Sequence, residues 1–393
     1  MDFTYDDEQQ ALREAVRGLV GKTYSDFENR RRAVAEDPGF DELLWTRLAE
    51  MGVLGLPFAE EYGGMGAGPI EVGIVAQEMG RVLAPEPFLT CVVLAGGVVA
   101  AAGTDEQKGE VLEAVASGES LLAFAHAEPG SRWSASATAV TASTDGAADG
   151  DADGDAAGEG WTLTGVKEPV PHGARADRLV VSAALPGGGT GLFLVDADAT
   201  GLTRVGYGTY DGGRAARVEL SSTPAVPLGT AGADATATIA QALDATRIAA
   251  GMEAIGAMEF ALSATSEYLT SRKQFGVPLK TFQALTFRAA DMYVSLELAH
   301  SVALWATMVL ASGSTDEVAE AASRSALQVS RAGRHVGQEA IQLHGGIAMT
   351  AEYSVGSYTS HLTALDHLLG DGQFHLTGLA RGIGRYDEVD PQP

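Results

Sequence analysis

The spacing of apolar residues changes twice along this chain of 393 residues, and that change limits the fold more than any other feature. Residues 1–118 repeat apolar side chains at helical spacing, whereas residues 119–232 contain short alternating runs between Gly, Pro and Asp turns. Residues 233–393 return to long helical patterns. Helices, then a β unit, then a helical bundle indicate an α+β fold, and we expect three domains with these boundaries.

The middle part predicts a small antiparallel barrel or sandwich, because its strands are short and separated by turn residues. The expected strands are Trp161–Thr164, Arg178–Ala183, Gly191–Val195 and Ala216–Leu220. The last part predicts long helices over Ala235–Phe275, Phe282–Ser312 and Asp316–Leu343. The first of these has apolar residues on more than one face, which is typical of a helix inside a bundle or at a subunit interface.

Composition excludes several classes of protein. The formal net charge of −26 repels nucleic acid and anionic lipid, so neither is expected as a partner. The single cysteine, Cys91, excludes an internal disulfide framework, and the histidines lack metal-ligand spacing, so no metal site is expected. The acidic N-terminus is unlike a signal peptide, and no run approaches the length of a membrane span. We therefore expect a cytoplasmic protein without membrane insertion.

A stretch from Thr144 to Gly160 consists almost only of Gly, Ala and Asp. Calcium-binding repeats also use Gly-Asp spacing, but they need a long array with apolar positions between the acids. A solvated hairpin loop is the interpretation that the composition favours.

Two polar motifs in the last part have the chemistry of a nucleotide site. Arg272 and Phe275 are three residues apart at the end of the first long helix, so we expect them to share a face, with Gln283 just beyond. A guanidinium can pair with a diphosphate, and a phenyl ring can pack on adenine or ribose. The simpler alternative is an Arg that complements the helix dipole and a Phe in the core.

Gln342-Leu343-His344-Gly345-Gly346 closes a later helix. The two glycines allow close approach of the backbone, and their N–H groups can face phosphate oxygens. A glycine C-cap beside a satisfied His344 is the alternative. The presence of both motifs in one helical segment indicates a nucleotide site more specifically than either motif alone.

With these motifs the chain resembles the acyl-CoA dehydrogenase family over essentially its whole length. The other segments that carry the resemblance are Glu60-Glu61-Tyr62-Gly63-Gly64, Ala127-Glu128-Pro129-Gly130 and Gly165-Val166-Lys167. The resemblance implies an N-terminal helical domain, a central β-barrel and a C-terminal four-helix bundle. It also implies a tetramer with FAD at a subunit interface, α,β-desaturation of an acyl-CoA thioester, and an electron-transfer flavoprotein as acceptor.

By the same resemblance, six residues contact the ADP half of a neighbouring subunit's FAD. They are Arg272, Phe275, Gln283, Gln342, Gly345 and Gly346.

The chain departs from the family pattern where the flavin ring is held. Ala127 stands in place of a Thr that touches the flavin, Pro169 in place of a flanking aromatic, and Pro171 in place of a hydroxyl residue. The prolines also remove two backbone N–H donors, so we expect this chain's own flavin pocket to be dismantled.

The catalytic base is also altered. The family's Glu before a Gly corresponds to Asp371, whose side chain is one methylene shorter, and a misplacement of about 1 Å can cost on the order of 10²-fold in rate. The position of the family's alternative base corresponds to Thr246, whose hydroxyl cannot serve as the catalytic base. The favoured interpretation of Asp371 is a turn residue in Gly-Asp-Gly.

These losses predict a non-catalytic subunit of a heteromeric acyl-CoA dehydrogenase. The resemblance is to the second subunit of actinobacterial α2β2 enzymes associated with steroid side chains, which completes the ADP site of a catalytic partner. Two alternatives stay open: a homotetrameric dehydrogenase with Asp371 as base, and a flavin-free acyl-CoA-binding or scaffold protein.

Overall fold

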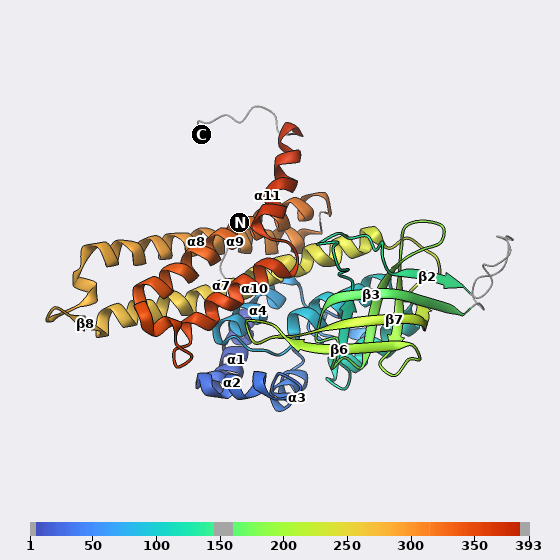
Figure 1. Cartoon of the computed structure of the whole chain (residues 1–393), viewed down its shortest axis with the longest axis horizontal. Coiled ribbons are helices and arrows are strands. Elements are labelled where there is room, and N and C mark those ends of the chain that lie inside the picture. The colour runs from blue at the N-terminus through green and yellow to red at the C-terminus, as the bar shows by residue number, and fades with distance from the viewer. Residues whose placement is uncertain (1–4, 145–159, 314, 386–393) are drawn as a thin grey trace. The chain divides into compact units, whose positions relative to one another are not determined.

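The computed structural model describes residues 5–144, 160–313 and 315–385, and it confirms the α+β fold (Figure 1). The Gly/Ala/Asp loop expected over 144–160 lies almost entirely outside the described residues. Contacts group the chain into a helical unit (residues 1–21, 73–83 and 247–393) and a barrel unit (residues 22–72 and 84–246). The domain boundaries at residues 118 and 232 stay predictions.

The secondary structure follows the predicted order, with helices on both sides of a run of strands. The α-helices are α1 (Asp7–Tyr24), α2 (Phe27–Ala35), α3 (Glu42–Glu50), α4 (Pro69–Val82), α5 (Gly97–Ala102), α6 (Asp105–Ala116), α7 (Thr236–Ser271), α8 (Gln283–Ser312), α9 (Thr315–His344), α10 (Val355–Leu368) and α11 (Gly372–Arg381). The strands are β1 (Leu122–Ala125), β2 (Thr141–Thr144), β3 (Trp161–Pro171), β4 (Arg178–Ala184), β5 (Thr190–Asp196), β6 (Leu202–Gly208), β7 (Arg214–Pro227), β8 (Lys273–Gln274) and β9 (Val277–Pro278). A π-helix spans Phe88–Gly96, and short 3-10 turns lie at Glu60–Tyr62, Leu279–Thr281, Gly345–Met349 and Ile383–Arg385.

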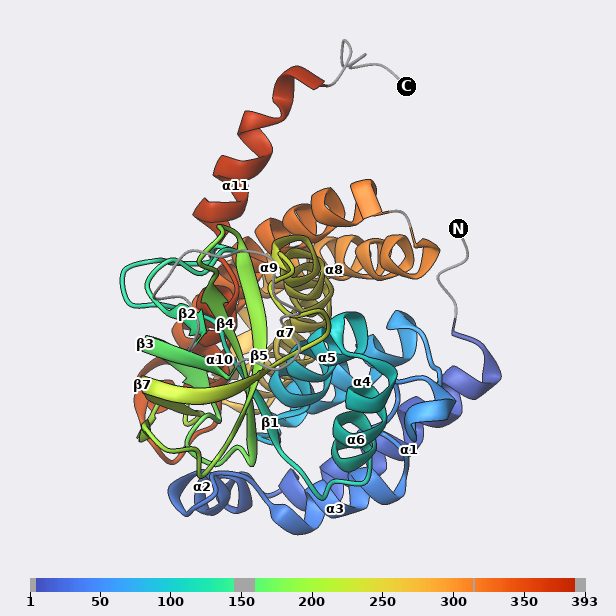
Figure 2. The same ribbon diagram turned by 90° about the vertical axis from the view of Figure 1, so that its right-hand side faces the viewer.

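In the helical unit, α7 carries buried side chains on several faces, among them Ile248, Ala257 and Met258. This burial agrees with the predicted apolar residues on more than one face of the helix. Helices α8 and α9 run side by side in both ribbon views (Figures 1 and 2). Their seam is closed by two polar contacts: Arg288 donates to Glu339 in a bidentate pair, and Ser295 Oγ lies 2.7 Å from His335 Nδ1.

The end of α7 differs from the sequence prediction. The helix stops at Ser271, and β8 and β9 form a hairpin whose two turn residues are Phe275 (φ 52°) and Gly276 (φ 82°). Positive φ at both turn residues is typical of a type I′ turn. The prediction that the helix extends to Phe275, with Arg272 and Phe275 on one helical face, is therefore wrong. Gly276 adopts a left-handed backbone without steric cost, so a tight turn forms here instead of a further turn of helix.

The barrel unit closes its strands into a ring. The hydrogen-bonded order is β1-β4-β2-β3-β7-β5, β4 also pairs with β5, and β6 pairs with β7. The strand runs predicted from sequence lie within β3, β4, β5 and β7. The predicted barrel is confirmed, but it is not purely antiparallel, because β4 pairs in parallel with both β1 and β2.

By length and composition, α8 is apolar enough to cross a membrane, and it is the one helix of the described residues that is. This differs from the prediction that no segment would qualify. A core helix of a soluble bundle passes the same test, and α8 packs along α9 here, so a single such helix is weak evidence of a membrane span.

Candidate functional site

The structure brings the two predicted motifs to the same end of the helical unit. Tyr268, one turn before Arg272, packs on His344, which directly precedes Gly345, with ring centroids 4.5 Å apart. His344 is buried, and its Nδ1 lies 2.7 Å from the carbonyl oxygen of Ala340. A contact between a half-buried and a buried ring thus joins the end of α7 to the end of α9.

Phe275 stands at the tip of the β8–β9 hairpin with 92% of its surface exposed. Its ring contacts only the edge of one other aromatic in the structure described, that of Phe282 at 6.1 Å between centroids. A left-handed backbone costs a side chain with a Cβ about 1–2 kcal/mol, and turns of this type favour Asn, Asp or Gly. An exposed aromatic in a strained position points to a binding role rather than a packing role.

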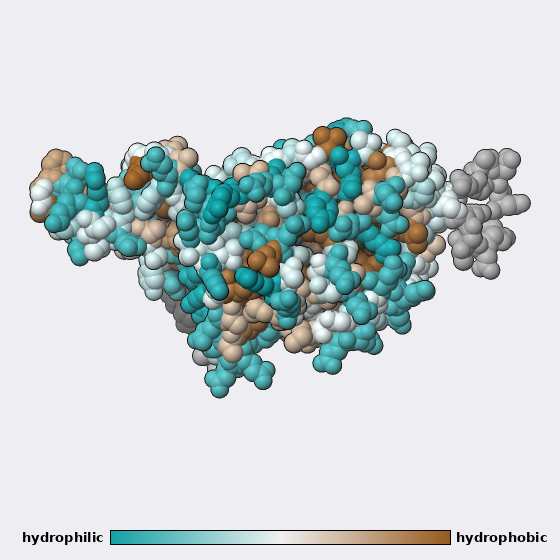
Figure 3. All heavy atoms as spheres, turned by 90° about the horizontal axis from the view of Figure 1, so that it is seen from below, coloured by the Kyte–Doolittle hydropathy of each residue, from teal (hydrophilic) through white to brown (hydrophobic). Residues whose placement is uncertain are grey.

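The remaining five residues of the predicted cofactor set are all exposed: Arg272, Gln283, Gln342, Gly345 and Gly346. The end of the unit that carries the β8–β9 hairpin lies at the left of the space-filling view (Figure 3). A guanidinium, an aromatic ring and two amides suit the diphosphate, base and ribose of an ADP group. The residues present therefore fit the ADP half of FAD. Because the set is open to solvent, it is also accessible to a second chain. Contact with FAD stays a prediction for each of these residues.

Asp371 is the N-cap of α11. Its Oδ1 accepts a hydrogen bond of 2.8 Å from the backbone N–H of Phe374, and its backbone is extended, as in most N-caps. The turn interpretation of Asp371 agrees with this geometry. The carboxylate is partly buried and already has a structural partner.

The loop that carries Asp371 is held from three sides. Arg247 Nε donates to the carbonyl oxygen of Leu369 at 2.7 Å, and Asp366 Oδ1 accepts from the Gly372 N–H at 3.2 Å. Gly370 has φ +126°, and a Cβ there would lie 2.8 Å from His375 Nε2. The sequence prediction missed Arg247, Asp366 and His375 as parts of this site. The two glycines around Asp371 were the available signal, since they indicate close packing.

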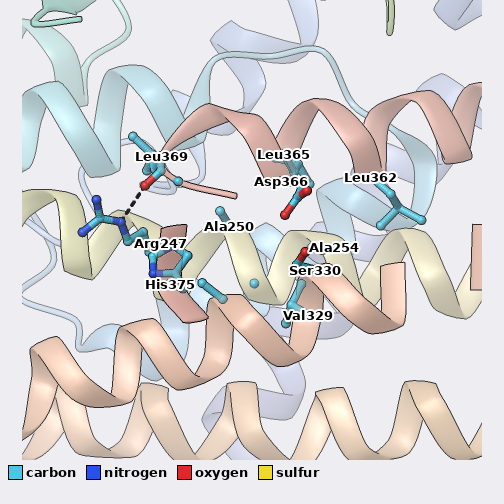
Figure 4. Close-up of a pocket in the computed structure, with 13 residues that line it drawn as sticks. Arg247, Ala250, Ala254, Val329, Ser330, Leu362, Leu365, Asp366, Leu369 and His375 are labelled. Carbon is cyan, nitrogen blue, oxygen red and sulfur yellow. Dashed lines mark hydrogen bonds between the residues drawn. The ribbon is translucent and has the colours of Figure 1, made fainter. Parts of the chain in front are cut away.

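Behind this loop is a small cavity of about 40 Å³ between α7, α9, α10 and α11 (Figure 4). Asp366 and Ser330 point toward one another across it, and Arg247 and His375 lie together at its other end. Burial lowers the pKa of His375 to about 4, so the ring is neutral at pH 7. The cavity can hold a water molecule but is far smaller than the roughly 300–1,000 Å³ of ligand pockets. It cannot accept an acyl chain.

Thr246, which the sequence predicts at the family's alternative base position, is fully buried. Its Oγ1 donates to the carbonyl oxygen of Ala242 at 2.7 Å, one turn earlier in α7. The hydroxyl therefore serves the helix backbone.

In the barrel unit, Lys167 and Glu128 form a buried ion pair with 2.8 Å between Nζ and Oε1. Lys167 Nζ also donates to the carbonyl oxygen of His126 at 3.0 Å and to Ser182 Oγ at 3.1 Å. Burial lowers the pKa of Lys167 to about 8, although Glu128 favours its charged form. Burial opposes ionisation of Glu128, yet hydrogen bonds from Lys167 and from the backbone of Val140 lower its pKa to about 2. The pair fixes the segment that contains Ala127.

Of the two prolines expected at the flavin pocket, Pro169 lies at an irregularity within β3 and Pro171 is the last residue of that strand. The pairing of β3 with β7 is irregular between Lys167 and Val170, which brackets Pro169. Beyond Pro171, His172 is left-handed (φ 55°) and lies 3.3 Å from Thr90 Oγ1. Burial lowers the pKa of His172 to about 4. Pro169 and Pro171 have no N–H to offer a ligand at this edge of the barrel.

A helical N-terminal part, a closed barrel and a helical bundle with an exposed nucleotide-type motif define a flavin-dependent dehydrogenase architecture. Residues 6–119 match the model of the acyl-CoA dehydrogenase N-terminal domain, and residues 236–384 match that of the C-terminal domain. The acyl-CoA dehydrogenase IpdE2 of Mycobacterium tuberculosis is 31% identical over 363 residues, which cover 91% of each chain. The chain therefore belongs to the acyl-CoA dehydrogenase family.

Solved structures agree with this assignment. A variant of the Tcur3481-Tcur3483 steroid ACAD matches with TM-score 0.84 and 32% identity, covering 96% of this chain and 98% of that one. The ChsE4-ChsE5 complex from Mycobacterium tuberculosis matches with TM-score 0.85 and 26% identity, covering 99% and 100%. FAD, the expected cofactor, is the cofactor of this family; a glutaryl-CoA dehydrogenase from Mycobacterium smegmatis, 21% identical and similar in fold, was solved with FADH2.

Proposed function

We propose that this chain is the non-catalytic subunit of a heteromeric acyl-CoA dehydrogenase and completes the ADP half of a FAD site for a catalytic partner. The main observation behind the proposal is that the carboxylate of Asp371 caps α11 and is therefore engaged in a structural hydrogen bond rather than free to act as a base. The strained and exposed Phe275 at the other motif supports it, because among the described residues its ring contacts one other aromatic ring, that of Phe282.

Each residue group has a defined part in the proposal. Arg272 binds the diphosphate, Phe275 packs on the adenosine, and Gln283 and Gln342 hydrogen-bond the same half. The backbone at Gly345 and Gly346 allows close approach of that half. When bound, FAD supplies the hydride acceptor for α,β-desaturation of an acyl-CoA thioester, and the partner subunit supplies the base.

The substrate class and assembly are part of the same proposal. Two of the similar structures are complexes named for two components, and one of them is named a steroid ACAD. We propose an α2β2 assembly acting on a bulky acyl-CoA such as a steroid side-chain thioester. We also propose an electron-transfer flavoprotein as the electron acceptor and a cytoplasmic location.

Co-expression tests the proposal. The chain is produced alone and together with an acyl-CoA dehydrogenase homologue from the same genome that retains the catalytic Glu. We expect the chain alone to lack FAD and turnover, and the pair to hold about one FAD per two chains. A homo-oligomer of this chain with one flavin per chain and turnover on acyl-CoA would overturn the proposal in favour of Asp371 as base.

Variants of the chain make the assignment of the cofactor residues specific. Phe275→Ala and Arg272→Ala should release FAD from the pair without loss of assembly. Ile383→Ala is the matched control, since Ile383 is also an exposed apolar residue of the helical unit, at 74% exposure. Absence of a yellow chromophore in every combination of chains would favour a flavin-free scaffold.

A further inference from the structure

The barrel unit contains a pocket of ligand size that the proposed function does not use. Its volume is about 530 Å³, within the roughly 300–1,000 Å³ that small-molecule sites occupy. It is lined by the α2–α3 loop with the first residue of α3, by the turn after β3, by β6 and by the start of β7. Ala127, Pro169 and Pro171, predicted beside the flavin ring, are not among the described residues that line it. The residues that decide its chemistry are Asp37, Pro38, Glu42, Ala174, Arg175 and Arg214.

Arg214 is fixed in this pocket by backbone groups. Its Nη2 donates to the carbonyl oxygens of Val34 at 3.0 Å and Glu36 at 3.2 Å, at the end of α2. Gly39 has a left-handed backbone (φ 96°), and a Cβ there would lie 2.5 Å from Arg214 Cγ, so glycine leaves room for the stem. Arg214 Nη1 makes no hydrogen bond to the residues that the structure describes. The guanidinium is therefore held in place with donors that a ligand can use.

The charged groups of the pocket differ in exposure. Arg214 Nη2 is 3.9 Å from Asp37 Oδ1, and the two side chains are 28% and 101% exposed. Arg175 Nη2 is 3.5 Å from Glu42 Oε1, and these side chains are 45% and 64% exposed. In both pairs the guanidinium is less exposed than the carboxylate, so water screens the positive charge less than the negative one. The interior of the pocket is therefore cationic and its rim is acidic.

This order of charges fits a zwitterion. The two pairs have no net formal charge, whereas the whole chain carries −26 and repels a ligand that is only an anion. A ligand that is only a cation would meet the two guanidinium groups inside the pocket. An α-amino acid carries a carboxylate and an ammonium on one carbon, so both groups can contact a guanidinium and a carboxylate that are 3.9 Å apart.

We propose that this pocket of the barrel unit binds a free α-amino acid with an apolar side chain. The carboxylate accepts hydrogen bonds from Arg214 Nη1, and the ammonium donates to Asp37 at the rim. The side chain of the ligand packs on Pro38 and Ala174, which belong to the apolar part of the lining. The site requires neither FAD nor a partner subunit, so its failure would leave the proposed function unaffected.

Three related compounds test the two charges of the ligand separately. Phenylalanine carries both groups, 3-phenylpropanoate lacks the ammonium, and 2-phenylethylamine lacks the carboxylate. In isothermal titration calorimetry of the full-length chain, phenylalanine should bind about tenfold or more tightly than either analogue. Failure of phenylalanine to bind, or equal affinity for phenylalanine and one analogue, would overturn the proposal.

Variants assign each charge of the ligand to a residue. Arg214→Gln should weaken the binding of phenylalanine about tenfold or more, because the carboxylate loses its donor. Asp37→Asn should also weaken the binding of phenylalanine but not that of 3-phenylpropanoate, which has no ammonium. An Asp37→Asn chain that binds phenylalanine as tightly as wild type would contradict a zwitterionic ligand.

Two further variants separate binding from folding, since Arg214 also bonds the backbone at the end of α2. Ala174→Leu fills the pocket at an exposed position without a change of charge and should abolish binding. Arg132→Gln is the matched control, because it removes an exposed arginine of the barrel unit that is not among the lining residues, and binding should stay unchanged. Circular dichroism checks that each variant is folded. Phenylalanine binding that persists in Ala174→Leu would place the ligand elsewhere and overturn the proposal.

Discussion

The carboxylate of Asp371 and the backbone N–H of Phe374 are joined by a hydrogen bond of 2.8 Å that caps α11. An Asp at this position stabilises the helix by satisfying an N–H that has no partner within it. The sequence predicts that the same residue stands in place of the family's catalytic Glu, so its structural and chemical roles can be separated by substitution.

Asp371→Ala should lower the free energy of unfolding by about 1 kcal/mol, whereas Asp371→Asn should change it by a few tenths, because Asn also caps helices. Urea unfolding measures both. Asn removes the charge but keeps the cap, so turnover of the assembly with its partner should stay within about twofold. A loss of about 10²-fold in the Asn variant would instead identify Asp371 as the base.

Phe275→Asn should change stability and cofactor content in opposite directions. Asn tolerates the left-handed backbone of the turn, so we expect the hairpin to gain about 1 kcal/mol and the thermal midpoint to rise. The assembly should lose FAD, measured by flavin absorbance per chain. Gly276→Ala is the reciprocal control: it strains the turn but keeps the ring. Equal flavin content in Phe275→Asn and wild type would contradict a cofactor role for Phe275.

Lys167→Met should destabilise the chain by about 3–5 kcal/mol, because it leaves the carboxylate of Glu128 buried without its cation. The double variant Lys167→Met/Glu128→Gln removes both charges and should recover much of that loss. Urea unfolding of the three proteins at pH 7 measures the coupling. A double variant as unstable as the single one would show that Lys167 acts through its hydrogen bonds to His126 and Ser182 instead.

Glu86 should make stability fall as pH rises. Its Oε1 accepts hydrogen bonds from Tyr24 Oη (2.5 Å) and the Asp41 N–H (3.1 Å), and its Oε2 is buried with no partner in the described part of the chain. Burial raises the pKa of Glu86 to about 7 from 4.5. Since the folded pKa is the higher one, this contribution is complete below pH 4.5 and is lost as pH rises through about 7.

The expected loss is about 3 kcal/mol between pH 4.5 and pH 8. Glu86→Gln cannot ionise, so the difference in unfolding free energy between Gln variant and wild type should grow in favour of Gln over this range. Other groups titrate in both proteins and cancel in the difference. A difference that stays constant with pH would show that Glu86 is not the group that titrates.

The sequence was sufficient for the class of fold. Long helical spacing on both sides of short alternating runs gives an α+β fold, because periods of 3.6 and 2 residues bury one face of a helix or a sheet. Runs such as Arg178–Ala183 lie within the observed strands for this reason. The spacing did not show that β4 pairs in parallel with β1 and β2, since strand order depends on residues far apart in the chain.

The candidate site was predicted in composition but not in geometry. Arg272 and Phe275 were expected on one helical face. Strand β8 (Lys273–Gln274) separates them instead, and Phe275 lies in the turn that follows, because Gly276 adopts a left-handed backbone at little cost. Arg247, Asp366 and His375 were not predicted at all. They come from three helices and meet around the loop of Asp371 only after the bundle has packed.

The sequence by itself determined the family. It also predicts a nucleotide motif and the loss of Thr, aromatic and Glu side chains at three flavin and base positions. These are properties of residue identity and local spacing. Tertiary structure alone decided that the carboxylate of Asp371 caps a helix, that Phe275 is held strained in water, and that Lys167 pairs with Glu128 in the interior. The physical reason is that hydrogen-bond partners, exposure and charge pairing depend on which distant segments pack together.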